Sequence, residues 1–72
     1  MADNDAGKFH KVAEVEHGTL KRIYWNDGET ARQIEVPELC GIWQARGFNE
    51  LSIEDKASFA NERGYILIEV LL

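Results

Sequence analysis

Two histidines and one cysteine are the side chains of this 72-residue sequence best suited to nucleophilic or metal chemistry. His10 and His17 are seven positions apart, and Cys40 lies far along the chain. Zinc sites are recognised from closely spaced pairs such as Cys-x-x-Cys or His-x-x-x-His, and the sequence has no such pair. Cys40 could act as a nucleophile with a distant histidine, but its neighbours Leu39 and Ile42 favour a small buried thiol. We therefore expect no metal, no cofactor and no catalytic residue.

Carboxylates are numerous but are spread along the sequence. Glu14 and Glu16 share one face of a strand by its two-residue period, which favours a solvated face over an acid–base pair. Glu69 stands in an apolar segment, where it either points to solvent or pairs with a basic residue of a neighbouring strand. A small ligand-binding or catalytic protein that uses Glu69, His10 or Cys40 stays open as an alternative.

One segment mixes basic and aromatic residues: Lys21, Arg22, Tyr24 and Trp25. Single-stranded nucleic acids are bound by such stacking platforms. Strict alternation along a strand places Lys21 on the face of Trp25 and Arg22 on the opposite face. The net charge of −5 and the pI of about 4.9 make direct nucleic-acid binding a weak hypothesis, because affinity for a phosphate backbone comes from clustered Lys and Arg. The six glycines form no phosphate-binding loop.

Trp43 and Arg46 belong to residue types that are enriched where protein interfaces gain most of their energy. The alternative, which we favour, is that Trp43 is a core residue and Arg46 caps a helix end. If the protein binds a partner, we expect the contacts among Tyr24, Trp25, Trp43, Arg46, Glu14 and Glu16.

The elements that position these residues follow from apolar periodicity and turn signals. We expect strands over 8–16, 19–25 and 30–36, with turns at His17-Gly18 and around Asp27-Gly28. Asp-Gly between two strand-like runs predicts a type I′ hairpin, because that turn needs positive φ at both central positions.

Two helices are expected after these strands. Pro37 stops the third strand and suits the first turn of a helix over 37–46, which Gly47 closes. Ser52 is the expected N-cap of a second helix over 53–63, which Gly64 ends. The apolar stripe expected on this second helix consists of Ile53, Ala57 and Ala60, with Phe59 beside it.

The last segment, Tyr65–Leu72, is too short to span a membrane and reads as a strand that is apolar on both faces. Such a strand is expected inside the sheet or covered by a partner. The sequence thus predicts an α+β domain over 8–72, with the order β-β-β-α-α-β, a mainly antiparallel sheet and a helical pair on one face. Residues 1–7 are expected to form a flexible tail.

The overall composition is that of a globular domain, with 44% hydrophobic and 29% charged residues. A single cysteine allows no internal disulfide and favours a reducing compartment. No signal peptide is visible in the first residues. We expect a cytoplasmic protein that binds no membrane.

The segment Val36-Pro37-Glu38-Leu39-Cys40-Gly41 resembles the Pro-Asp/Glu-Leu-Pro-Gly-Cys segment of the HicB-like antitoxin domain. Gly47 matches the downstream glycine of the family. Glu54, Ala57 and Ala60 match the Glu- and Ala-rich helix that follows in the family. The resemblance implies a β-β-β-α-β sheet domain in which Leu39–Arg46 is a strand rather than a helix. It also implies a protein that binds and blocks a toxin ribonuclease.

These observations lead to a functional hypothesis. We expect a small acidic non-enzymatic module that occludes a larger basic protein, as an antitoxin or a phage-encoded inhibitor does. Charge complementarity would speed association and suppress wrong partners. A structural homodimer whose Tyr65–Leu72 strands or apolar faces pair across a two-fold axis is the alternative.

Overall fold

The computed structural model describes residues 9–27 and 32–70. The predicted α+β class and the order β-β-β-α-α-β are confirmed, with a short 3₁₀ helix added between the two α-helices. The elements are β1 (Phe9–Glu16), β2 (Thr19–Asp27), β3 (Arg32–Glu35), α2 (Pro37–Ala45), η1 (Phe48–Glu50), α3 (Ile53–Glu62) and β4 (Ile66–Val70). The predicted tail over 1–7 and most of the Asp-Gly turn lie outside the described residues.

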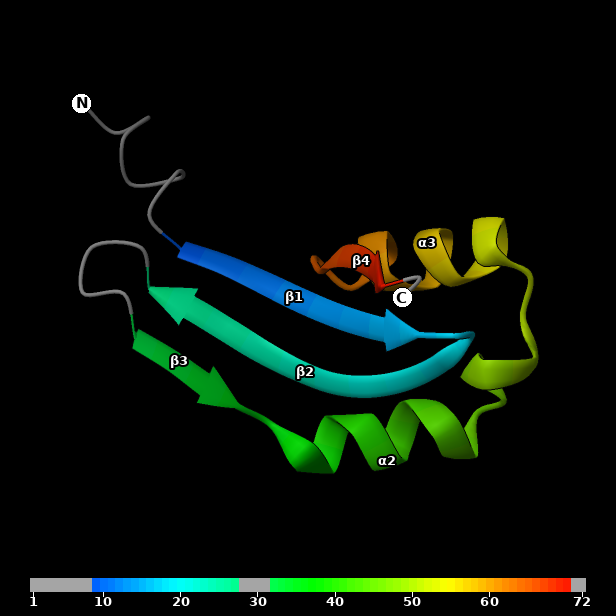
Figure 1. The fold of residues 1–72 in the computed structure, drawn as a ribbon, viewed down its shortest axis with the longest axis horizontal. Coiled ribbons are helices and arrows are strands. Elements are labelled where there is room, and N and C mark those ends of the chain that lie inside the picture. The colour runs from blue at the N-terminus through cyan, green and yellow to red at the C-terminus, as the bar shows by residue number, and fades with distance from the viewer. Residues whose placement is uncertain (1–8, 28–31, 71–72) are drawn as a thin grey trace.

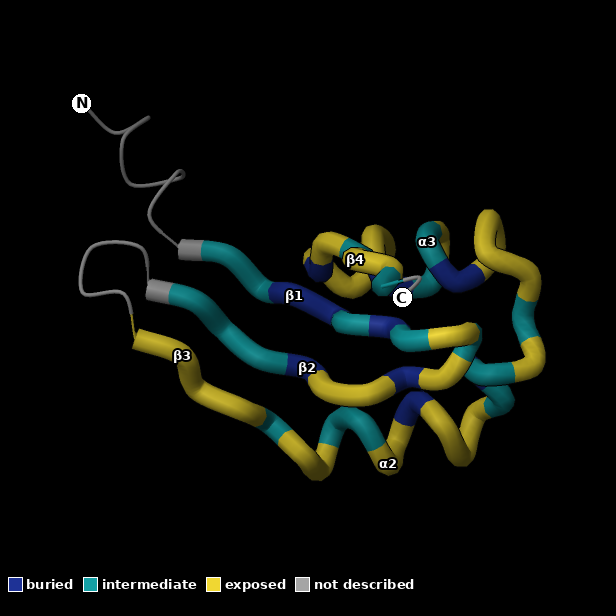
Figure 2. The backbone as a smooth tube through the Cα atoms, in the orientation of Figure 1, coloured by how far each residue is buried: buried dark blue, intermediate teal, exposed yellow. Residues whose placement is uncertain are grey.

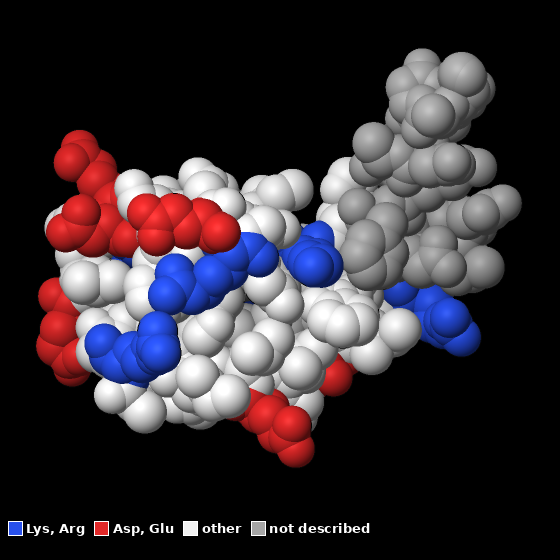
Figure 3. Space-filling view, turned by 180° about the vertical axis from the view of Figure 1, so that it is seen from behind, with Lys and Arg blue, Asp and Glu red and all other residues white. Residues whose placement is uncertain are grey.

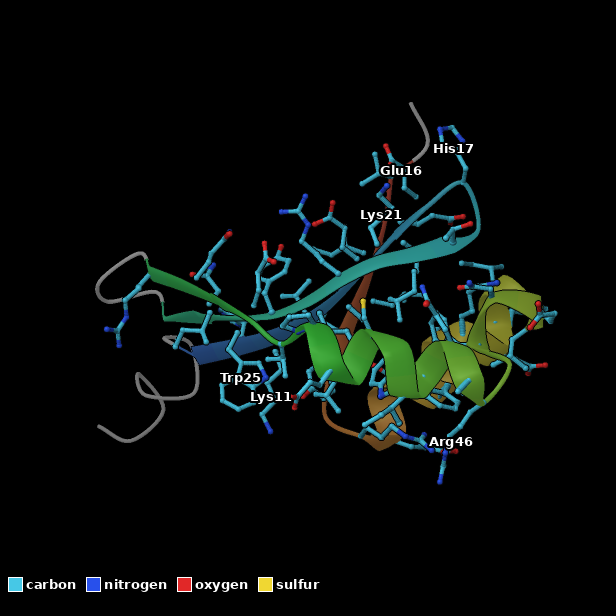
Figure 4. All side chains as sticks on the ribbon, turned by 90° about the horizontal axis from the view of Figure 1, so that it is seen from below. Lys11, Glu16, His17, Lys21, Trp25 and Arg46 are labelled. Atoms are coloured by element: carbon cyan, nitrogen blue, oxygen red, sulfur yellow. The ribbon has the colours of Figure 1, made fainter. Side chains whose placement is uncertain are left out.

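The four strands form one sheet in the order β3-β2-β1-β4 (Figure 1). β2 pairs antiparallel with both β1 and β3, and β4 runs parallel to β1. α2 packs against β2 and α3 against β4, and both helices lie on the same side of the sheet (Figure 4). A chain that returns through two helices can add its last strand beside the first, and β1 and β2 therefore occupy the centre.

The expectation that the last strand lies inside the sheet is wrong, because β4 is an edge strand. The apolar residues on the two faces of β4 differ in how far they are buried. Leu67 packs against the core, whereas Ile66 is 50% exposed and Ile68 is 42% exposed.

The turn between β1 and β2 is as tight as the sequence predicts. His17 has a φ of 52° and Gly18 a φ of 83°, so both central residues lie in the left-handed region. This is the geometry of a type I′ turn, which matches the twist of the strands that it joins.

A β-bulge interrupts the pairing of β1 with β2. Val15 is opposite Leu20 but Glu14 is opposite Arg22, so Lys21 is an extra residue in β2. Lys21 and Arg22 consequently both reach carboxylates of β1, and the predicted alternation that placed Lys21 with Trp25 is wrong. A bulge bends the strand that carries it, and β2 is visibly curved in Figure 1.

The two α-helices begin and end close to where local signals place them. Pro37 occupies the first turn of α2, and the strand that the family resemblance implied over Leu39–Arg46 is not formed. The Ser52 hydroxyl accepts a hydrogen bond from the Asp55 N–H at 3.1 Å and caps α3. Arg63 Nη1 donates to the Phe59 carbonyl at 2.9 Å.

The buried stripe of α3 differs from the prediction. Lys56 and Ala60 are buried, whereas Ile53 is 45% exposed. On the face that is buried instead, the Lys56 ammonium group donates to the carbonyls of Asn49 and Leu51.

The core lies between the sheet and the helices. Its buried members are Ala13, Val15, Leu20, Ile23, Trp43, Phe48, Ala60 and Tyr65. The Trp43 ring is at its centre, with ring centroids of Phe48, Phe59 and Tyr65 within 5.1–5.4 Å. Figure 2 shows the buried stretches of β1 and β2 in mid-sheet, and β3 exposed along its length.

Candidate interaction surface

The sheet has one side that no described helix covers, and we call it the open face. It is opposite the side on which Ala13 and Leu67 pack into the core, so alternation and strand register define its members. They are His10, Val12, Glu14 and Glu16 from β1, Arg22, Tyr24 and Asn26 from β2, Gln33 and Glu35 from β3, and Ile66, Ile68 and Val70 from β4. Lys21 of the bulge joins them through its ion pair.

The centre of the open face carries paired charges. Arg22 lies between Glu14 and Glu35, with nitrogen–oxygen distances of 3.6 and 3.8 Å. Lys21 Nζ is 3.5 Å from a Glu16 carboxylate oxygen, and both side chains point away from α2 in Figure 4. These pairs are exposed and each stabilises the fold by less than about 1 kcal/mol. Three carboxylates against two cations leave this network with a small negative excess.

The β4 side of the open face is apolar. In the parallel register Ile66 lies beside Val12, Ile68 beside Glu14 and Val70 beside Glu16. Val12 is only 5% exposed, whereas Ile66 and Ile68 keep about half of their surface in water. Contiguous exposed apolar side chains bordered by charges are typical of surfaces that bind other proteins.

Of the six residues expected to contact a partner, Glu14, Glu16 and Tyr24 belong to the open face, where Tyr24 lies next to Val12 and is half-buried. Three of the six residues thus share one face. The sequence did not single out Ile66 and Ile68, because apolar residues on both faces of the last strand were interpreted as a sign of burial.

The other three residues lie elsewhere. Trp25 points to the helix side, where its Nε1 donates to the Tyr65 hydroxyl at 3.2 Å and the Lys11 Nζ lies 5.8 Å from its ring centroid (Figure 4). Trp43 is 2% exposed, so a partner could not reach it in this fold. Arg46 is exposed at the end of α2.

The residues considered for catalysis are separated by the fold. His10 is at the start of β1, Glu69 is exposed on β4 beside Val15, and Cys40 is on α2. Burial raises the pKa of the Cys40 thiol, and the Glu35 carboxylate adds to this rise, while a backbone hydrogen bond with Ile23 acts against it.

Within residues 9–27 and 32–70 there is no pocket and no group of three or more potential metal ligands. None of the helices in that part of the chain is both long and apolar enough to cross a bilayer.

Charge of both signs is also present on the far side of the molecule. Figure 3, seen from behind Figure 1, shows a band of Lys and Arg atoms with Asp and Glu atoms at its margins.

Comparison with known proteins adds no relative: no family model, no curated protein and no solved structure matches this chain.

Proposed function

We propose that this protein is a non-enzymatic binding domain that docks a larger basic protein on its open face. The observation that supports the proposal best is the exposure of Ile66 and Ile68 on an uncovered sheet face, next to a network of ion pairs. Protein interfaces combine apolar with polar surface, and here the apolar part lies along β4 beside the charged centre of the open face. Because Ile66 and Ile68 are already about half buried, covering the rest of one of them contributes about 1 kcal/mol.

The charge network supports a basic partner. Arg22 and Lys21 hold Glu14, Glu16 and Glu35 in exposed pairs that are weak in water. Basic side chains of a partner can add to these carboxylates, which exceed the local cations. The resulting attraction would speed association and would weaken as salt rises.

The small size of the domain agrees with an inhibitory role. A domain of 8.2 kDa that covers an active site of a larger protein would block it without any chemistry of its own. The resemblance to the HicB-like antitoxin domain points the same way and suggests a toxin ribonuclease as one kind of target. The helix formed by α2 departs from the strand that this resemblance implies, so the open face is the better guide to the partner.

Affinity capture tests the proposal with two charge-reversal variants. Glu35→Lys alters the open face, and Glu62→Lys alters α3. The carboxylates of Glu35 and Glu62 are both well exposed. Both variants change the net charge by the same amount, so long-range attraction is matched and only the position differs. We expect the wild type and Glu62→Lys to capture the same basic protein from a native lysate at low salt and to release it at high salt. Glu35→Lys should bind it about ten-fold more weakly, which corresponds to about 1.4 kcal/mol.

A second pair of variants tests the apolar part. Ile66→Lys places a charge on the open face, and Ile53→Lys places one on α3 at nearly equal exposure, 50% against 45%. Only Ile66→Lys should abolish capture. The proposal fails if no salt-sensitive partner is found, or if the two members of either pair lose binding equally.

A further inference from the structure

We infer that the outer edge of β4 pairs antiparallel with β4 of a second copy of this chain. The two-fold axis of this dimer passes beside Ile68. The inference concerns the backbone edge of the sheet rather than its open face, so it stands apart from the proposed function. It follows from the contrast between the two edges, from the direction of the backbone groups and from the pattern of side chains.

The two edges of the sheet differ in how they resist pairing. β3 is four residues long, is exposed throughout, carries Arg32, Gln33 and Glu35, and is followed by Pro37. Short length, charge and proline are the devices that keep an edge strand unpaired. β4 has the sequence Ile-Leu-Ile-Glu-Val, without Lys, Arg or Pro, and its pairing with β1 contains no bulge. β4 is only one residue longer than β3 and carries Glu69, so the contrast lies in the basic residue and the following proline that β3 has and β4 does not.

The free backbone groups of β4 can be assigned from one hydrogen bond. The His17 N–H donates to the Val70 carbonyl at 3.4 Å, so the backbone of Val70 faces β1. Backbone groups alternate in direction along a strand, and Ile68 and Ile66 therefore also face β1. The N–H and C=O groups of Leu67 and Glu69 point to the outer edge, where no described strand meets them.

This arrangement is complementary to itself. With an axis at Ile68, Leu67 lies opposite Glu69 of the second copy, and the two residues exchange both of their hydrogen bonds. By symmetry, Glu69 of the first copy forms the same two hydrogen bonds with Leu67 of the second copy. All outward N–H and C=O groups of Leu67 and Glu69 are then satisfied in both copies. Ile68 then faces its own counterpart as a non-hydrogen-bonded pair, with Cα atoms about 4.5 Å apart. Ile66 lies opposite Val70, so the open-face side chains of β4 form one continuous apolar row.

Charge also permits a second copy in spite of the net −5. On the open face the seam between the two β4 strands contains only apolar side chains. The nearest carboxylates, Glu14 and Glu16, are already paired with Arg22 and Lys21. Glu69, the one ionisable residue within β4, lies opposite Leu67 rather than opposite another carboxylate.

Cysteine cross-linking tests both the dimer and its register, in a Cys40→Ser background with oxidised glutathione as the oxidant. Ile68→Cys should form a disulfide between copies, because a Cα separation of about 4.5 Å lies within the range that disulfides allow. Ile66→Cys should not, because its counterparts are four positions apart, about 13 Å along the strands. Ile34→Cys on β3 is the matched control, since Ile34 and Ile68 are both 42% exposed. Equal cross-linking at positions 68 and 34, or at 68 and 66, would overturn the inference.

Sedimentation velocity tests the dimer independently, without a cross-link. We expect a dimer at micromolar concentrations for the wild type and for Ile34→Lys. Ile68→Lys, which brings two ammonium groups together at the axis, should raise the dimer dissociation constant at least ten-fold while its circular dichroism stays unchanged. A wild type that is monomeric at hundreds of micromolar contradicts the dimer. Glu35→Lys lies far from β4 and should dimerise normally, so loss of partner binding and loss of the dimer can be told apart.

Discussion

At the scale of single residues, the buried ammonium group of Lys56 is the least expected feature of the core. Lys56 is 4% exposed, and its Nζ donates to the carbonyl oxygens of Asn49, at 3.2 Å, and Leu51. It also lies 5.8 Å from the centroid of the Phe48 ring. Lys56 therefore closes the 3₁₀ turn from inside the molecule, because these two carbonyls accept bonds from its side chain. A charged residue in this position cannot be recognised from its type, since lysine is usually exposed.

Replacing Lys56 with methionine tests this role. The substitution keeps the unbranched stem but leaves two carbonyl groups in a poorly solvated place without their donor. We expect Lys56→Met to lower the free energy of unfolding by about 2 kcal/mol, measured by urea denaturation. Lys21→Met is the control, because the Lys21–Glu16 pair is exposed and should contribute less than about 1 kcal/mol. Equal effects of the two substitutions would contradict a structural role for Lys56.

At the scale of elements, the β-bulge links the sheet to the helical layer. Leu20 precedes the bulge and lies beyond the part of β2 that pairs with β3. The Leu20 N–H donates to the Asn49 side-chain oxygen at 2.9 Å, and the Leu20 carbonyl accepts from Gln44 Nε2 at 3.0 Å. η1 and α2 are thus both attached to β2 at the bulge. The same irregularity brings Lys21 and Arg22 to the open face and so creates its ion pairs.

The Asn49→Ala variant should loosen this junction. Without the Asn49 side-chain oxygen, the Leu20 N–H loses its acceptor, and we expect a loss of about 1–2 kcal/mol in the free energy of unfolding. Amide hydrogen exchange should show faster exchange at Leu20 than at neighbouring β2 amides. Asn61→Ala, on the exposed side of α3, should leave that amide unchanged. Unaltered exchange at Leu20 in both variants would show that the bond is unimportant.

At the scale of the whole molecule, one small core must hold together a sheet and two helices. A domain of this length buries only about 60% of the surface of its unfolded chain. Its total stability is expected to be about 4–11 kcal/mol, from the usual range per residue. Phe48 is 0% exposed and contacts both Trp43 and Phe59, so one side chain of the 3₁₀ helix supports α2 and α3 together.

Truncation of Phe48 should therefore affect the entire fold. Phe48→Ala removes a fully buried ring, which costs about 3–5 kcal/mol, a large part of the total. We expect cooperative unfolding at a melting temperature far below that of the wild type, followed by circular dichroism. Phe48→Leu should restore much of the loss. Phe59→Ala is the comparison, because Phe59 is only half-buried and should cost less. A milder effect at Phe48 than at Phe59 would contradict this view of the core.

Local signals in the sequence determined most of the elements. The His17-Gly18 turn, the Pro37 start of α2, the Ser52 cap and the element order were all predictable, because each depends on backbone dihedrals or hydrogen bonds between residues close in the chain. The buried stripe of α3 was not predictable in the same way, because packing of α3 against β4 and η1 decides which of its faces turns inward.

Only the tertiary structure decided which strand lies at the edge and which side of the sheet stays uncovered. The residues of β4 are apolar on both faces whether a strand is central or peripheral, so composition alone could not distinguish the two. The choice depends on α3, which packs behind β4 and leaves Ile66 and Ile68 in water. Contacts between residues distant in sequence made that choice, and both the open face and the free β4 edge result from it.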